Sequence, residues 1–154
     1  GTGNEREAGA ETGSGTETGT ETETETETET GDAQLTDRER EQQSDLLARD
    51  GARAVARGEL DEATATIQRA LALDPENPRA FAANAALFIA REDGAQAIEW
   101  AEKAVRRRAR RSEYHVLLGD ARRLAGNEVA ARRAWERALE VDPDNRTAAR
   151  RLRR

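Results

Sequence analysis

The residues best suited to chemistry in this sequence of 154 residues are its arginines, which are concentrated in two clusters. A guanidinium group binds a carboxylate or a phosphate through two parallel hydrogen bonds, so clustered arginines favour an anionic ligand. We expect the first cluster to form a basic patch that consists of Arg106, Arg107, Arg108, Arg110 and Arg111. The second cluster lies at the C-terminus and consists of Arg146, Arg150, Arg151, Arg153 and Arg154.

Four interpretations of these clusters stay open. An acidic protein, a nucleic acid or the chain's own acidic N-terminal segment could bind there. Alternatively, the arginines form a solvated surface that nearby glutamates partly neutralise, and codon usage explains why the chain has 24 Arg and a single Lys. Nucleic acid is disfavoured because no aromatic residues are interleaved with the arginines for base stacking, and because the net charge of the chain is −6.

No group of residues predicts catalysis. The chain has no Cys and a single His, His115, which excludes disulfides and leaves too few ligands for a transition-metal site. Two carboxylate pairs, Asp61 with Glu62 and Asp142 with Asp144, fall near expected helix ends, where helix capping accounts for them. The sequence contains neither a Gly-rich phosphate loop nor a nucleophile motif. We therefore expect no enzyme activity, no cofactor and no metal, and we interpret His115 as structural.

Composition divides the chain near residue 35. Residues 1–35 carry a net charge of −9 and no aromatic residue, and they include a strict alternation of Glu and Thr from Glu21 to Thr30. Such a segment has no apolar face to bury, so we predict a disordered acidic tail over 1–34. Residues 101–154, by contrast, carry a net charge of +8. We predict one folded domain over 35–154, whose basic end the acidic tail could mask.

Seven helices must position these arginines. Thr36 with Glu39 forms a capping-box pattern at the start of the first helix. Asp74-Pro75 and Asp142-Pro143 end helices, because the residue before a proline avoids the α region. We place the helices near 37–57, 60–73, 78–91, 94–108, 112–125, 128–141 and 146–153, and we expect no strand.

The helices repeat with a period of 34 residues. The phrases ALALDPENP and ALEVDPDNR lie two periods apart, and three sets of small residues recur at this interval: Ala63, Ala97 and Ala131; Ala70, Ala104 and Ala138; and Gly51, Ala85 and Gly119. Self-similarity at this period indicates an array of stacked helical hairpins, none of which can bury its apolar face alone.

The repeated unit resembles the tetratricopeptide repeat. In the third unit the family's pattern of large, small and proline positions reads His115, Leu118, Gly119, Arg122, Ala131, Trp135 and Pro143. Three units, 44–77, 78–111 and 112–145, match the pattern, and residues 146–153 fit a capping helix. The resemblance implies an all-α fold, an α-solenoid of tandem helix-turn-helix repeats. Asp50 and Asn84 occupy positions where the family usually has Leu.

The resemblance also implies a binding surface. The family uses the concave face, which the first helix of each unit lines, and the corresponding residues here are Ala48, Ala52, Val55, Ala82, Ala86, Ile89, Val116, Asp120 and Arg123. One branch of the family grips a terminal carboxylate with Lys, Asn and Arg, but the corresponding positions here hold Ala48, Ala52, Ala83, Glu113 and Leu117. We therefore expect no such carboxylate clamp. The alternative is that these alanines only reflect helix propensity.

The expected function is a non-enzymatic scaffold or adaptor that binds a peptide or a helix of another protein on the concave face. The two alternatives are an anion or nucleic-acid binder that uses the arginines, and a structural module that associates with itself. No apolar run is long enough to span a membrane. The first residue is Gly rather than Met, which indicates a processed product or an excised fragment. The sequence names neither the partner nor the compartment.

Overall fold

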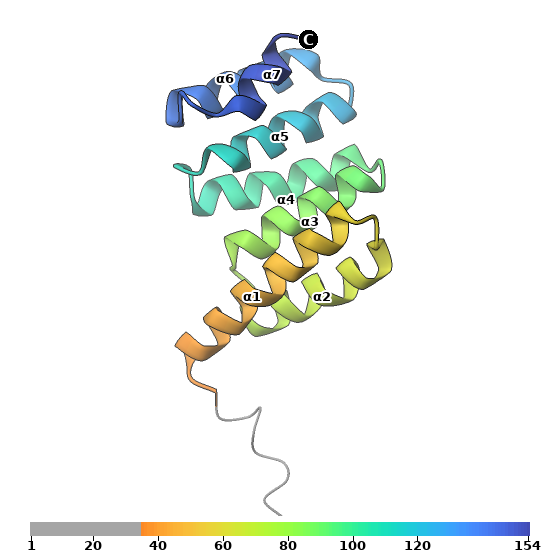
Figure 1. The fold of residues 1–154 in the computed structure, drawn as a ribbon, viewed down its shortest axis with the longest axis vertical. Coiled ribbons are helices and arrows are strands. Elements are labelled where there is room, and N and C mark those ends of the chain that lie inside the picture. The colour runs from red at the N-terminus through yellow and green to blue at the C-terminus, as the bar shows by residue number, and fades with distance from the viewer. Residues whose placement is uncertain (1–34) are drawn as a thin grey trace, which may run out of the picture. The chain divides into compact units, whose positions relative to one another are not determined.

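A computed structural model describes residues 35–154, which form seven α-helices (Figure 1). Their bounds are α1 (Asp37–Ala56), α2 (Leu60–Leu73), α3 (Pro78–Ala90), α4 (Gly94–Arg107), α5 (Ser112–Leu124), α6 (Glu128–Val141) and α7 (Arg146–Leu152). Every bound lies within one residue of the range expected from the sequence, and the described residues contain no strand. The disordered tail predicted for 1–34 lies outside the described residues.

Successive helices pack as antiparallel hairpins in one continuous stack. α1 packs on α2, α3 on α4 and α5 on α6, while α7 covers α6 at the C-terminal end. The first helices of neighbouring hairpins also touch, so α1, α3 and α5 lie side by side. The predicted all-α solenoid is confirmed. None of the helices within 35–154 is both long enough and apolar enough to cross a membrane.

Side chains that accept hydrogen bonds mark the starts of most helices. The predicted capping box is present: Glu39 N donates to Thr36 Oγ1 at 3.2 Å, and Thr36 N donates to Glu39 Oε2 at 2.8 Å. Four further helices begin at a residue whose side chain caps them, and these residues are Asn77, Asp93, Asn127 and Asn145. Such caps satisfy backbone donors that have no partner inside the helix.

The first helix of each unit ends in the same way. In the second unit Asp93 N donates to Phe88 O at 2.9 Å, and the equivalent bonds occur one repeat before and one repeat after. This turn needs a residue with positive φ, which is Gly58 (φ 77°) in the first unit and Gly126 (φ 84°) in the third. In the second unit the position holds Glu92 at φ 59°, where a side chain is unfavourable.

The two helices of each hairpin approach closely because the facing side chains match in size. A Cβ atom at Gly51 would lie 2.6 Å from Ile67 Cγ1, and one at Gly119 would overlap the Trp135 ring. In the second unit the same register holds two alanines, Ala85 and Ala101, which pack against each other. A large partner therefore requires glycine, and a small partner accepts alanine.

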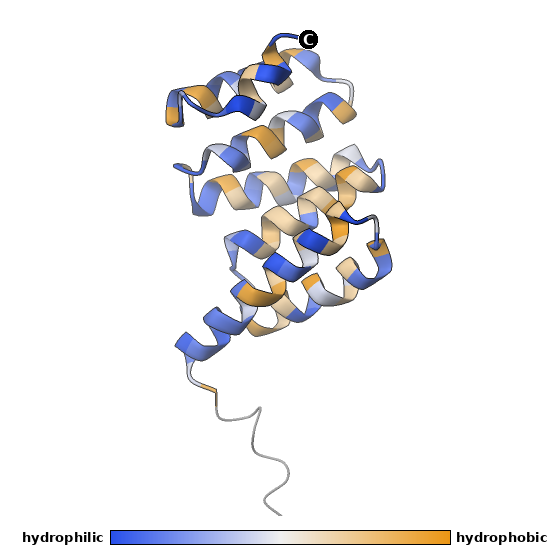
Figure 2. Cartoon of the chain, in the orientation of Figure 1, coloured by the Kyte–Doolittle hydropathy of each residue, from blue (hydrophilic) through white to orange (hydrophobic). Residues whose placement is uncertain are grey.

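The core runs through the whole stack. Trp135 and Ile67 are each 1% exposed, as is Leu87 of α3, and each packs in a cluster with buried alanines of its own and neighbouring helices. Hydrophobic and hydrophilic residues alternate along most helices in Figure 2, whereas the first turns of α1 are hydrophilic, and residues 36–43 are exposed. Burial is therefore continuous from α1 to α7 but does not include the start of α1.

We predict that Gly51→Ala destabilises the domain while Ile67 is present and stabilises it when Ile67 is absent. Overpacking against Ile67 costs about 1–3 kcal/mol. In an Ile67→Ala background that clash is gone, and the better helix propensity of alanine should add up to about 1 kcal/mol. Urea unfolding followed by Trp fluorescence measures both effects. An effect of the same sign in the two backgrounds would contradict the size-matching explanation.

We also predict that Glu92→Gly stabilises the domain. Removal of the side chain from a left-handed backbone should raise the free energy of unfolding by up to about 1 kcal/mol. Differential scanning calorimetry should show a rise of a few degrees in the melting temperature. Glu92→Ala is the matched control, because it removes the carboxylate and keeps the Cβ atom. An equal rise for both variants would mean that charge, not backbone strain, is the cause.

Candidate functional site

The first helices of the three hairpins line a groove with a volume of about 260 Å³. Its floor consists of alanine methyl groups from α1 and α3, namely Ala48, Ala52, Ala82, Ala83 and Ala86. Charged residues from all three helices and from the α4–α5 turn form its rim, namely Arg49, Arg79, Arg111 and Glu113, and Tyr114 lies beside them. We call this site the alanine groove.

Four of the residues expected on the concave face, Ala48, Ala52, Ala82 and Ala86, line the alanine groove. The expected residues beyond these four lie elsewhere. Val55 packs against the core of the first unit, and Ile89 is half-buried near the end of α3. Val116 is buried among α6 and α7 residues.

Asp120 and Arg123 make contacts within the third unit and with α7. Asp120 accepts hydrogen bonds from Trp135 Nε1 at 3.2 Å and from two nitrogens of Arg151 at 2.8 and 2.9 Å. The Arg123 guanidinium lies 5.3 Å from the centre of the Trp135 ring. These bonds hold α7 against α5, so the open groove is limited to the first two units and the start of α5.

Tyr114 is the side chain at the α5 end of the groove. It is 8% exposed and packs with Phe81 of α3 and Ala104 of α4. Burial raises the pKa of its phenol above the usual value, and the nearby positive charges of Arg111, Arg79 and Arg108 oppose that rise. Charges from two different segments therefore act on one hydroxyl group.

Two turns connect successive hairpins and a third connects the last hairpin to α7. The first and the last of these three turns share a network of side-chain bonds. In the first, Asp74 accepts from Glu76 N at 3.0 Å, and in the last, Asp142 accepts from Asp144 N at 3.1 Å. The asparagine that ends each of these turns donates to a serine on the preceding first helix. Asn77 donates to Ser44 at 2.8 Å, and the equivalent bond joins Asn145 and Ser112 at 2.9 Å.

The middle turn, residues 108–111, has the same backbone hydrogen bond as the outer turns but lacks their aspartate, proline and asparagine side chains. Arg111 N donates to Arg108 O at 3.1 Å, as the equivalent atoms do in the other turns. The sequence here is Arg-Ala-Arg-Arg, where the outer turns have Asp-Pro-Glu-Asn and Asp-Pro-Asp-Asn, and helix α5 begins without a side-chain cap. His115 instead forms a hydrogen bond at 2.8 Å from Nε2 to the carbonyl oxygen of Ala109. We call residues 108–111 the arginine turn.

The predicted basic patch therefore has two parts. Arg106 lies 3.8 Å from Glu102, and Arg107 lies 3.5 Å from Glu76. Within residues 35–154, the three arginines of the arginine turn form no ion pair with a carboxylate. Of the patch, only Arg111 lines the alanine groove, because Arg110 faces a different hollow beside α6.

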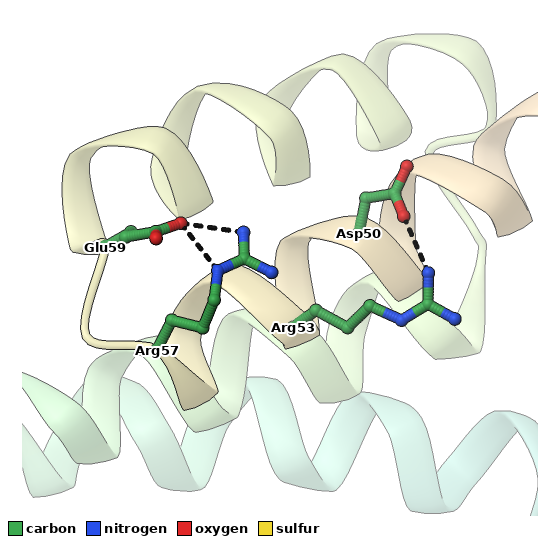
Figure 3. A network of polar contacts seen from close by, with 4 residues as sticks. All are labelled: Asp50, Arg53, Arg57 and Glu59. Atoms are coloured by element: carbon green, nitrogen blue, oxygen red, sulfur yellow. Dashed lines mark hydrogen bonds and ion pairs between the residues drawn. The ribbon is translucent and has the colours of Figure 1, made fainter.

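Some arginines elsewhere in the domain have carboxylate partners. Figure 3 shows two such pairs, Arg53 with Asp50 and Arg57 with Glu59. Arg53 Nη1 lies 3.2 Å from Asp50, and Arg57 Nε and Nη2 lie 2.9 and 2.7 Å from one oxygen of Glu59. The exposed pair with Arg53 also explains how Asp50 is accommodated at a position where a leucine is usual.

Sequence reasoning singled out Arg111 and four groove alanines, and it missed Arg49, Arg79 and Tyr114 as lining residues. A position-by-position comparison of the three turns would have drawn attention to residues 108–111. Nothing in the sequence marks Arg79 or Tyr114, because their role depends on how α3 and α5 pack. Within residues 35–154, no group of three or more His, Asp or Glu residues is arranged to hold a metal ion.

Comparison with known proteins identifies similar domains. Residues 54–121 match the family model described as tetratricopeptide repeat. The Sgt2 domain from Aspergillus fumigatus is 29% identical, with a TM-score of 0.66 over 71% of this chain and 74% of that one. The first domain of Spaghetti (RPAP3), bound to the HSP90 peptide SRMEEVD, is 26% identical, with a TM-score of 0.66 over 73% and 90%.

The first such domain of human RPAP3 is 25% identical, with a TM-score of 0.67 over 72% of this chain and 87% of that one. A comparison with curated protein sequences finds no match.

The shifted pKa of Tyr114 predicts a loss of stability at alkaline pH. Because the folded pKa lies above the unfolded value of about 10, the unfolded chain releases the proton first as the pH rises. The free energy of unfolding should therefore fall as the pH increases above about 10. Since the chain has one Tyr, absorbance at 295 nm reports this titration directly.

The control is Tyr114→Phe, which has no phenol to titrate and should lose less stability between pH 9 and 11. A folded-state midpoint at or below that of the urea-unfolded chain would contradict the assignment.

Proposed function

Because this chain contains a tetratricopeptide repeat domain, we propose that it acts as a scaffold or adaptor that binds an extended segment of another protein in the alanine groove. The domain is a protein-interaction module, and the groove supplies the surface. The observation that carries the proposal is the row of alanines from two neighbouring hairpins that lines the groove, of which Ala52, Ala82 and Ala86 keep exposed surface. An apolar floor of this kind favours a partner with apolar side chains, because binding removes the apolar surfaces of both molecules from water.

The shape of the floor restricts the partner. Ala48 and Ala83 are almost completely buried, and Ala82 and Ala86 are half-exposed, so the floor is shallow and offers no cavity for a large side chain. A segment with small apolar side chains can bring its backbone close to such a surface. Since the apolar contact area is small, affinity must come in part from the polar rim.

We further propose that binding does not use a terminal-carboxylate clamp. The clamp positions implied by the resemblance hold three alanines, Glu113 and Leu117, and Glu113 would repel a carboxylate at the rim. The peptide SRMEEVD, which is bound to the similar domain of Spaghetti (RPAP3), is a suitable probe. We expect the same affinity for this peptide with a free C-terminus and with an amidated one.

We predict that peptides selected for binding to this chain bind in the alanine groove. Extended peptides enriched from a random library should lose at least tenfold in affinity with Ala86→Leu, because the larger side chain fills the floor. Isothermal titration calorimetry of the full chain measures this change.

The matched control is Ala95→Leu, which makes the same substitution on the exposed face of α4, away from the groove. Equal affinity for the wild type and the Ala86→Leu variant would refute groove binding.

A further inference from the structure

We infer that the alanine groove selects an internal acidic segment of a partner protein, whose carboxylate side chains bind Arg111 and Arg79. The inference rests on the proposed function, because it specifies the partner of the same groove. It differs from a terminal-carboxylate clamp in its residues and in its ligand, since the recognised groups are side chains inside the segment.

The first argument is the loss of local structure in the arginine turn. The two outer turns each use an aspartate, a proline and an asparagine, and all three contribute bonds or backbone restraint. The middle turn replaces them with Arg108, Ala109 and Arg111, and the His115 bond to Ala109 replaces only part of the network. Residues that break a local structural rule without a structural gain are expected at functional sites.

The second argument is the charge at this end of the groove. Arg111 forms no ion pair within the described residues, and the Arg79 Nε lies 3.5 Å from Asp45. Both arginines line the alanine groove together with Tyr114, although they come from different segments. The opposing groove carboxylate is Glu113, which is exposed on the first turn of α5. With Arg49 on α1, the arginines of the rim outnumber its carboxylates.

The third argument is that side chains alternate in direction along an extended partner segment. Successive side chains of an extended segment point to opposite sides, so small apolar residues can face the methyl floor while acidic residues face the arginines. Arginine is suited to such carboxylates because it donates two parallel hydrogen bonds. A nucleic acid fits less well, because Tyr114 is buried and offers no stacking face, and because the floor is apolar.

The test uses the full chain and a fluorescein-labelled decapeptide of alternating Glu and Ala with an amidated C-terminus. Fluorescence anisotropy at low salt should show at least tenfold tighter binding than for the matched peptide with Gln in place of Glu. Added salt should weaken the binding of the Glu peptide. Binding of the Glu peptide that is no tighter than that of the Gln peptide overturns the inference.

Two variants distinguish a specific contact of Arg111 from a general effect of positive charge. Arg111→Gln should weaken binding of the Glu peptide about tenfold or more, whereas Arg110→Gln, which removes the same charge from the same turn, should leave it unchanged. Equal weakening by both variants would mean that the ligand contacts the whole patch without a specific site, and it would overturn the inference. A single-stranded oligonucleotide that binds more tightly than the Glu peptide would also overturn it.

The Arg111→Asn variant tests whether Arg111 has only a structural role. Asparagine caps the helix at the two equivalent positions, and the backbone of Arg111 is extended like theirs. The variant should therefore raise the melting temperature while it weakens peptide binding. A lower melting temperature together with weaker binding would assign Arg111 to the fold. If both peptides bind equally and Ala86→Leu abolishes both, the proposed function stands and this inference fails.

Discussion

The close approach of the two helices in each hairpin is the constraint on which the structure depends. It is satisfied by one pair of facing positions that recurs every repeat: Gly51 with Ile67, Ala85 with Ala101, and Gly119 with Trp135. Because interiors are packed without voids, a larger residue on one helix requires a smaller one on the other. The hairpins can then stack at a constant spacing, which brings α1, α3 and α5 into a row. The alanine groove exists because that row is regular.

Polar bonds as well as apolar contacts complete the C-terminal end of the stack. Asp120 joins Trp135 and Arg151, so one half-buried carboxylate connects the last hairpin to the short helix α7. Hydrogen bonds to a charged group are stronger than neutral ones, and this group is largely shielded from water. The same bonds engage Asp120 on the concave side of α5, and the Arg123 guanidinium lies over the Trp135 ring, so the alanine groove is limited to the first two units and the start of α5.

The three turns that follow α2, α4 and α6 show how one backbone conformation can carry two different sets of side chains. The outer turns use aspartate, proline and asparagine side chains to fix the chain and to reach the preceding hairpin through Ser44 and Ser112. The arginine turn keeps the same backbone bond without these side chains, and His115 supplies a substitute contact. The stack tolerates this exchange because its stability comes mostly from packing between neighbours.

The sequence by itself determined the fold class, the seven helices and the repeat, because these depend on local signals. The Thr36 capping box, the Asp-Pro steps and the 34-residue spacing of small residues are all readable along the chain. Only the tertiary structure decided which concave positions stay open. Val116 and Asp120 occupy the same helix face as Ala48 and Ala82 in the repeat, yet α6 and α7 cover them. The packing of α3 against α5 also places Arg79, Arg111 and Tyr114 beside one groove. The positions of these residues along the sequence do not reveal that they lie together.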